Sequence, residues 1–196
     1  ASKTVSIILY LIARAQSDKQ PTLTSIVSES FPHLRRGAMR DFLLIMTEHE
    51  YFKDKFWNKS ESTYYFETGS KLEFFSADQP DKLRGALRDR LFLNEANNLS
   101  FDAFEQLEVR TKEFIFIDWN PTNEFWAMTE LGNRDDTEKI ILTYKDNEVL
   151  SQEIIDSIEQ RKGRKGWWQV YGLGQLVEVE GKIYRDWQII DEIQHQ

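Results

Sequence analysis

The sequence predicts an α/β fold, in which a mainly parallel sheet is flanked by helices and carries an antiparallel hairpin. Short apolar or β-branched runs alternate with amphipathic segments of crossover length, which is typical of parallel strands joined by helices. Some of these runs are almost wholly apolar, as expected for strands covered on both faces. The chain has 196 residues, enough for one such domain.

The first half of the chain predicts two helices, three strands and a loop. A spacing near 3.6 residues between apolar positions predicts each helix, and β-branched or alternating runs predict the strands. Pro32 and Gly37 bound the loop, and Thr68-Gly69-Ser70 supplies the turn of the hairpin. The order is helix 3–15, strand 22–27, loop 31–37, helix 39–56, and hairpin strands 62–67 and 71–76.

The second half predicts further strands and helices in alternation. Ser100 is a favourable N-cap for a helix, and Gly172 and Gly174 end the last helix. Apolar runs around residues 115 and 141 predict two more buried strands. The order is strand 90–93, helix 100–110, strand 113–117, loop with short helix 122–131, strand 139–143, helix 151–160, basic turn 162–166, helix 167–171 and a strand-like tail 175–190.

Composition excludes several classes of protein. Cysteine is absent, which removes disulfide frameworks, thiolate zinc sites and cysteine nucleophiles. No apolar run approaches the roughly 18 residues that a membrane span needs. The net charge of −8 argues against a sequence-reading DNA module, because such modules are usually basic. The chain opens on a helix pattern with neither a starting Met nor a signal peptide, and we interpret it as a fragment of a longer protein.

The start of the first helix has the residue types of a phosphate site. Lys3 and Thr4 stand where free backbone amides face an anion. The lysine supplies positive charge for a phosphate, and the threonine hydroxyl is a ligand for Mg²⁺. A solvated first turn is the alternative interpretation.

Two predicted strands end in polar residues that suit the same chemistry. Asn94 and Glu95 follow one strand, and such a pair can place a metal-side residue and a water-activating carboxylate beside a nucleotide. Asp118 and Asn120 follow the next strand, and either can hydrogen-bond a terminal phosphate or its attacking water. Ordinary strand-end turns are the alternative. The order of the three segments is that of an additional-strand P-loop ATPase.

The chain from Ser30 to Trp187 resembles the ATPase domain of the large terminase subunit of tailed phages and prophages. The residues that carry the resemblance are SFPHLRRGAMRDF (30–42), KLRGALRDRLFLNEANN (82–98), FIDWNPTNEFW (116–126), TYKDNEVLS (143–151), WWQVYGLG (167–174) and EGKIYRDW (180–187). NEANN and DWNPTNEFW are the specific stretches among them.

The resemblance implies roles for the residues at the nucleotide. Ser2, Lys3 and Thr4 would end the phosphate-binding loop and bind ATP, with Mg²⁺ held by Thr4 and Asn94. Glu95 would be the catalytic carboxylate. Asn94 departs from the Asp that is common at its position, and an uncharged amide is a weaker Mg²⁺ ligand. The earlier glycines of the loop and its preceding strand lie outside the chain.

The resemblance also implies a coupling segment and an arginine finger. Asn120, with Asp118 nearby, would sense the terminal phosphate. Arg84 would reach the nucleotide site of a neighbouring subunit, where its planar and permanently charged fork suits phosphoryl oxygens. A loop-surface arginine is the alternative. His33 shows no metal spacing, and Arg35-Arg36 is interpreted as a solvated turn that could also touch DNA or a neighbouring subunit.

The function implied is an ATPase motor that translocates double-stranded DNA into a procapsid in the host cell cytoplasm. Its partners would be DNA, the small terminase subunit and the portal protein, with the motor assembled as a homo-oligomeric ring. Residues 1–175 would form the P-loop ATPase domain, and 176–196 a linker toward a nuclease domain outside the chain. The alternative is an ATP-independent docking or DNA-binding domain of a packaging complex.

Overall fold

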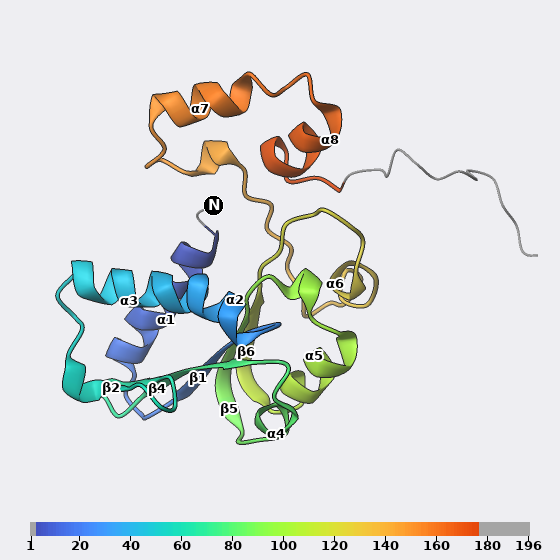
Figure 1. Ribbon diagram of the computed structural model, residues 1–196. Coiled ribbons are helices and arrows are strands. Elements are labelled where there is room, and N and C mark those ends of the chain that lie inside the picture. The colour runs from blue at the N-terminus through green and yellow to red at the C-terminus, as the bar shows by residue number, and fades with distance from the viewer. Residues whose placement is uncertain (1–2, 177–196) are drawn as a thin grey trace, which may run out of the picture.

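The computed structural model describes residues 3–176 and has a six-stranded sheet at its centre (Figure 1). The strand order is β2-β3-β4-β1-β5-β6, in which β4, β1, β5 and β6 are parallel and β2, β3 and β4 are antiparallel. The predicted mainly parallel sheet with an antiparallel hairpin is confirmed. The strands are β1 (Leu23–Ser28), β2 (Trp57–Asn58), β3 (Thr63–Tyr65), β4 (Lys71–Ser76), β5 (Arg88–Leu93) and β6 (Thr111–Ile117).

Helices cover both faces of the sheet. One face carries α1 (Lys3–Ser17), α2 (Phe31–Arg36) and α3 (Ala38–Glu48), and the other carries α4 (Pro80–Leu83), α5 (Phe101–Glu108) and α6 (Trp126–Thr129). Figure 1 shows α7 (Gln152–Glu159) and α8 (Lys165–Trp167) together, apart from these layers. Short 3-10 turns lie at Asp54–Phe56, Ala96–Asn98 and Tyr144–Asp146, and a π-helical turn spans Trp168–Gly172.

The core has two halves because strand side chains alternate between the faces. Ile26 and Phe74 pack under α1 and α3, whereas their neighbours Val27 and Phe75 pack under α5. All four side chains are at most 2% exposed. The strands β1 and β4 are thus covered on both faces. Ser100 begins α5 as predicted, since its hydroxyl accepts a 3.2 Å hydrogen bond from the Ala103 amide.

The predicted loop 31–37 is wrong, because residues 31–36 form α2. Pro32 occupies the first turn of that helix, where its missing N–H is no loss and its fixed φ favours helix. Gly37 then separates α2 from α3.

The predicted helix 39–56 is too long. It ends at Glu48, after which Glu50 takes a φ of 58° and the amides of Tyr51 and Phe52 bond back to the Met46 carbonyl.

The predicted strand 139–143 is also wrong, since these residues form no strand. A strand needs a neighbour for its backbone groups, and no described strand lies alongside this apolar run. Ile140 and Ile141 are instead 69% and 51% exposed.

The predicted strand 113–117 is confirmed as β6, but its apolar side chains are only half-buried because β6 is an edge of the described sheet. The predicted tail 175–190 lies almost wholly outside the described residues.

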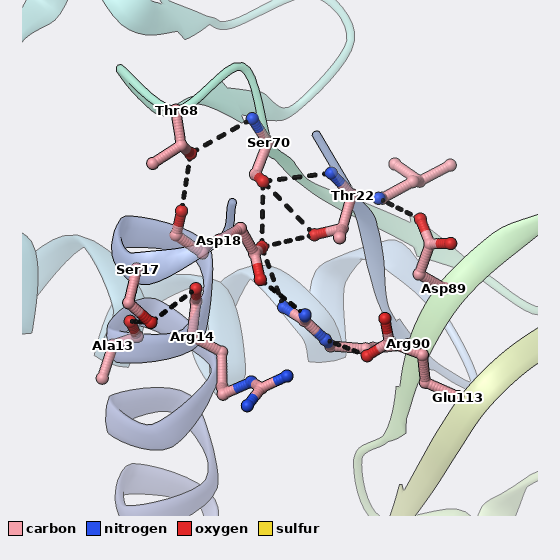
Figure 2. A network of polar contacts seen from close by, with 12 residues as sticks. Ala13, Arg14, Ser17, Asp18, Thr22, Thr68, Ser70, Asp89, Arg90 and Glu113 are labelled. Atoms are coloured by element: carbon pink, nitrogen blue, oxygen red, sulfur yellow. Dashed lines mark hydrogen bonds and ion pairs between the residues drawn. The ribbon is translucent and has the colours of Figure 1, made fainter. Parts of the chain in front are cut away.

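A polar network closes the end of the sheet where β1 and β5 begin (Figure 2). Arg90 donates to both carboxylate oxygens of Asp18, at 2.6 and 3.0 Å, and to Glu113 at 2.7 Å. Asp18 also accepts from the hydroxyls of Thr22 and Ser70. Burial alone would raise the pKa of Asp18, but hydrogen bonds from Arg90, Thr22 and Ser70 outweigh it and lower that pKa. This ion pair connects α1 to the sheet.

Candidate functional site

A cavity of about 380 Å³ opens at the opposite end of the sheet. The carboxyl ends of β5 and β6, the first turn of α1 and the junction of α2 with α3 surround it. In open α/β sheets this is the edge where ligands bind. Six residues singled out from the sequence line the cavity together: Lys3, Thr4, Asn94, Glu95, Asp118 and Asn120. The structure therefore gathers residues from three distant segments into one site.

Lys3 begins α1 and crosses to the segment that follows β6. Its ammonium donates to the Trp119 carbonyl at 2.7 Å and to Oδ1 of Asn120 at 3.1 Å. Burial lowers the pKa of Lys3, while the nearby carboxylates of Asp118 and Glu95 oppose that shift. The ammonium of Lys3 therefore lies at the cavity wall, with the carboxylates of Asp118 and Glu95 close by.

Asp118 is the central hydrogen-bond acceptor of the site. It is 5% exposed and lies directly after β6. The Thr4 hydroxyl donates to its Oδ2 at 2.6 Å, and the Glu95 amide donates to its Oδ1 at 2.7 Å. The Asp118 carboxylate thus connects α1 with the ends of β5 and β6.

Asn94 also hydrogen-bonds the Asp118 carboxylate. Its side-chain amide nitrogen donates to Oδ1 of Asp118 at 3.2 Å, and its Oδ1 accepts from the Ser28 hydroxyl at 3.1 Å. Only the nitrogen of an amide can donate to a carboxylate, which sets the orientation of the group. The Asn94 oxygen consequently faces Ser28 rather than the Thr4–Asp118 pair.

Glu95 has an unusual backbone for a residue with a side chain. Its φ and ψ are both 53°, in the left-handed region. Such conformations in non-glycine residues are rare, and they concentrate at functional sites where the surroundings enforce them. Here the Asp118 side chain holds the Glu95 amide, and the Asp118 carbonyl accepts from the amide of Ala96 at 2.9 Å. The Glu95 carboxylate, 43% exposed, is left at the cavity.

The cavity has a basic wall that sequence reasoning missed. His33, Arg36 and Arg40 line it from α2 and α3. Arg40 pairs with Asp41 at 2.8 Å, whereas Arg36 forms no ion pair with the rest of the described chain. The interpretation of residues 31–37 as a loop concealed this wall. The family-like stretch 30–42 was the one signal that could have revealed it.

Two predicted residues remain, Ser2 and Arg84. Ser2 is outside the described residues. Arg84 follows α4, near the start of β5 and therefore at the other end of that strand from Glu95. It is exposed and donates to Oε1 of Gln106 at 3.3 Å. Arg84 thus takes no part in the cavity of its own chain. Among residues 3–176, no cluster of three or more acidic or histidine side chains is suited to a metal ion.

Comparisons with known proteins show the family and the fold of the chain. The family model described as phage terminase large subunit matches residues 1–175. The large terminase of a thermophilic bacteriophage matches with a TM-score of 0.75 at 20% identity, over 90% of this chain and 46% of that one. Its complex with ADP matches with a TM-score of 0.72 at 21% identity, over the same shares. No curated protein sequence is significantly similar.

The chain is also similar to an isolated terminase ATPase domain. The large terminase ATPase domain of Thermus phage P74-26 matches with a TM-score of 0.56 at 14% identity, over 90% of this chain and 84% of that one. The present chain spans less than half of the longer terminase but most of this domain. These likenesses show the P-loop ATPase fold, which confirms the predicted fold class. On the family match over most of its length, the chain belongs to the phage terminase large subunit family.

Proposed function

We propose that this chain is the ATPase motor of a large terminase, and that it hydrolyses ATP to translocate double-stranded viral DNA into a procapsid. The observation that carries the proposal is the convergence of Lys3, Thr4 and Glu95 on one cavity. The similar large terminase of a thermophilic bacteriophage has been solved with ADP and with ATP-γ-S, which supports nucleotide binding. No helix among residues 3–176 is long and apolar enough to cross a membrane.

The phosphates of ATP would bind between α1 and α2. Lys3 reaches the cavity from the first turn of α1, where unpaired backbone amides favour an anion. Arg36 faces the same space from α2 and has no carboxylate partner in the described chain. A planar guanidinium binds phosphate oxygens in pairs. Together the two cations would orient the terminal phosphate toward Glu95.

The residues present fit a magnesium ion. Mg²⁺ in nucleotide sites is held by one or two protein oxygens together with phosphates and water. The Thr4 hydroxyl and the Asp118 carboxylate are such oxygens and lie 2.6 Å apart. When bound, Mg²⁺ would offset the charge of the phosphate oxygens. We assign its protein contacts to Thr4 and Asp118. Asn94, predicted as a ligand, would orient Asp118 instead, because its oxygen accepts from Ser28.

Glu95 would act on the attacking water. One carboxylate oxygen accepts a proton from the water while the water oxygen bonds to the terminal phosphorus. The bond from that phosphorus to the leaving oxygen of ADP breaks on the opposite side. The left-handed backbone of Glu95 directs its side chain into the cavity. Asp118 and Asn120 contact Thr4 and Lys3, and would transmit the loss of the phosphate to β6.

Arg84 would serve a neighbouring subunit of a ring. It is exposed and distant from the cavity of its own chain, as a residue that acts across an interface must be. DNA, the small terminase subunit and the portal protein are the proposed partners, and the host cytoplasm the proposed location. We retain residues 1–175 as the proposed ATPase domain and 176–196 as the proposed linker.

Nucleotide binding and hydrolysis by the full-length gene product test the proposal. Mg-ATP is expected to raise the melting temperature, and DNA to stimulate phosphate release. Glu95→Gln should still bind ATP but hydrolyse it about 100-fold more slowly or worse. Glu105→Gln, an exposed carboxylate on α5, is the control and should leave the rate unchanged. Neither a melting shift nor hydrolysis at saturating Mg-ATP would favour the docking module instead.

A further inference from the structure

The imidazole of His33 is in direct contact with the carboxylate of Glu95. Nε2 of His33 lies 3.0 Å from Oε2 of Glu95. The two side chains are 39% and 43% exposed, and both line the cavity. Among residues 3–176, His33 is the one residue in polar contact with the Glu95 carboxylate. The contact therefore sets where that carboxylate points.

The other nitrogen of His33 indicates which ring nitrogen carries the proton. Nδ1 is buried and has no hydrogen-bond partner in the described part of the chain. A buried N–H without an acceptor is costlier and rarer than an unpaired acceptor. We therefore place the proton on Nε2, where it is donated to Glu95, and a lone pair on Nδ1. Nε2 then meets the carboxylate with its proton, at a distance of 3.0 Å.

The two backbones that carry these side chains are both held. The Glu95 backbone is fixed by Asp118, so its carboxylate direction depends on side-chain contacts alone. On the other side, Leu34 is fully buried in the core, and the His33 carbonyl accepts from the Gly37 amide at 2.9 Å. Two side chains on held backbones thus meet at the cavity.

We propose that His33 is a positioning residue for Glu95, an inference that rests on the proposed ATPase function. Its Nε2 contacts Oε2 at 3.0 Å, which would leave Oε1 turned to the attacking water to accept the proton. Arg36 lies three residues further along α2 and lines the same cavity. One short helix thus carries both the cation that would bind the phosphate and the donor that orients the carboxylate.

Substitutions that move the donor by one bond test this role. His33→Ala should lower kcat for ATP hydrolysis about tenfold, the worth of one hydrogen bond to a charged group, with KM for ATP within about twofold. His33→Gln should recover most of kcat, because its amide nitrogen reaches the position of Nε2. His33→Asn should not, because its nitrogen lies near the position of Nδ1. A purely structural role would make no distinction between glutamine and asparagine.

The outcomes separate this inference from the proposed function. An active parent with equal kcat in His33→Ala overturns the positioning role and leaves the ATPase proposal intact. Equal rates in His33→Gln and His33→Asn, or a change in KM alone, overturn it as well. In the Glu95→Gln background, His33→Ala should have no further effect, and an undiminished tenfold loss there contradicts the pairing. A parent that releases no phosphate overturns the proposed function, and this inference with it.

Discussion

The Thr4 hydroxyl donates a 2.6 Å hydrogen bond to the Asp118 carboxylate, which ties the first turn of α1 to the end of β6. The same carboxylate accepts from the amide of Glu95 at 2.7 Å. A helix start, a strand end and the proposed catalytic residue are thus connected through one buried group. The carboxylate that Thr4 contacts is thus the one that also holds the backbone of Glu95.

Removal of the Thr4 hydroxyl tests the proposed magnesium contact. Thr4→Val keeps the shape of the side chain but has no oxygen for a metal ion. We expect the Mg²⁺ concentration for half-maximal ATP binding to rise about tenfold, as titrations monitored by calorimetry would show. Thr4→Ser retains the hydroxyl and should resemble the parent. An unchanged requirement for Mg²⁺ in Thr4→Val would remove Thr4 from the metal site.

Arg36 should contribute to nucleotide affinity. Arg36→Ala removes a cation that faces the cavity without a carboxylate partner in the described chain, and Kd for ATP should rise about 10- to 100-fold. Arg35→Ala is the matched control, because Arg35 is the adjacent exposed arginine and does not line the cavity. Equal affinities of the two variants would exclude a phosphate contact by Arg36.

Arg84 should act between subunits. Arg84→Ala is expected to lose hydrolysis in the assembled motor yet to bind ATP normally, because Arg84 lies away from its own cavity. Mixing Arg84→Ala with Glu95→Gln subunits should restore about a quarter of the active interfaces, since each site draws on two chains. Lys82→Ala, an exposed residue of α4, is the control. No recovery on mixing would argue against a role across the interface.

The buried ion pair between Asp18 and Arg90 should stabilise the fold. Asp18→Asn leaves the Arg90 guanidinium, which is 1% exposed, without its main partner, and should cost about 3 kcal/mol of unfolding free energy. Chemical denaturation at neutral pH measures this. Glu67→Gln breaks the exposed pair with Lys53 and should change stability little. Similar stability of Asp18→Asn and the parent would contradict this assignment.

The same pair should make stability depend on pH. The folded-state pKa of Asp18 lies below its ordinary value of 3.8, so the ionised form is the one that folding favours. Its contribution is complete above pH 3.8 and is lost as the pH falls through the lower, folded-state value. The stability difference between the parent and Asp18→Asn should therefore shrink below about pH 4. A constant difference down to pH 2 would exclude this linkage.

Much of the site followed from the pattern of strands. Asn94 and Glu95 follow one apolar strand, and Asp118 and Asn120 follow another. Because parallel strands end at the same edge of a sheet, their convergence could be predicted. The residue types at the helix start then suggested a phosphate. None of this required the distance between any two of these residues.

The errors have two causes, one local and one in contacts between distant segments. Residues 31–37 were predicted as a loop because Pro32 and Gly37 interrupt the pattern, although Pro32 in fact begins a helix. That mistake concealed His33 and Arg36. The apolar run 139–143 was predicted as a strand from its composition, but a strand also requires a partner strand, which local sequence does not report.

Apolar periodicity and strand-end chemistry were thus sufficient for the α/β class, the order of most elements and six of the residues that line the proposed nucleotide site. Packing alone decided that α2 faces that site, that His33 meets Glu95, and that the Asn94 oxygen turns to Ser28. The physical reason is the distance along the chain over which each effect acts. Propensity and periodicity act over a few residues, whereas these contacts join segments that only the closed sheet brings together.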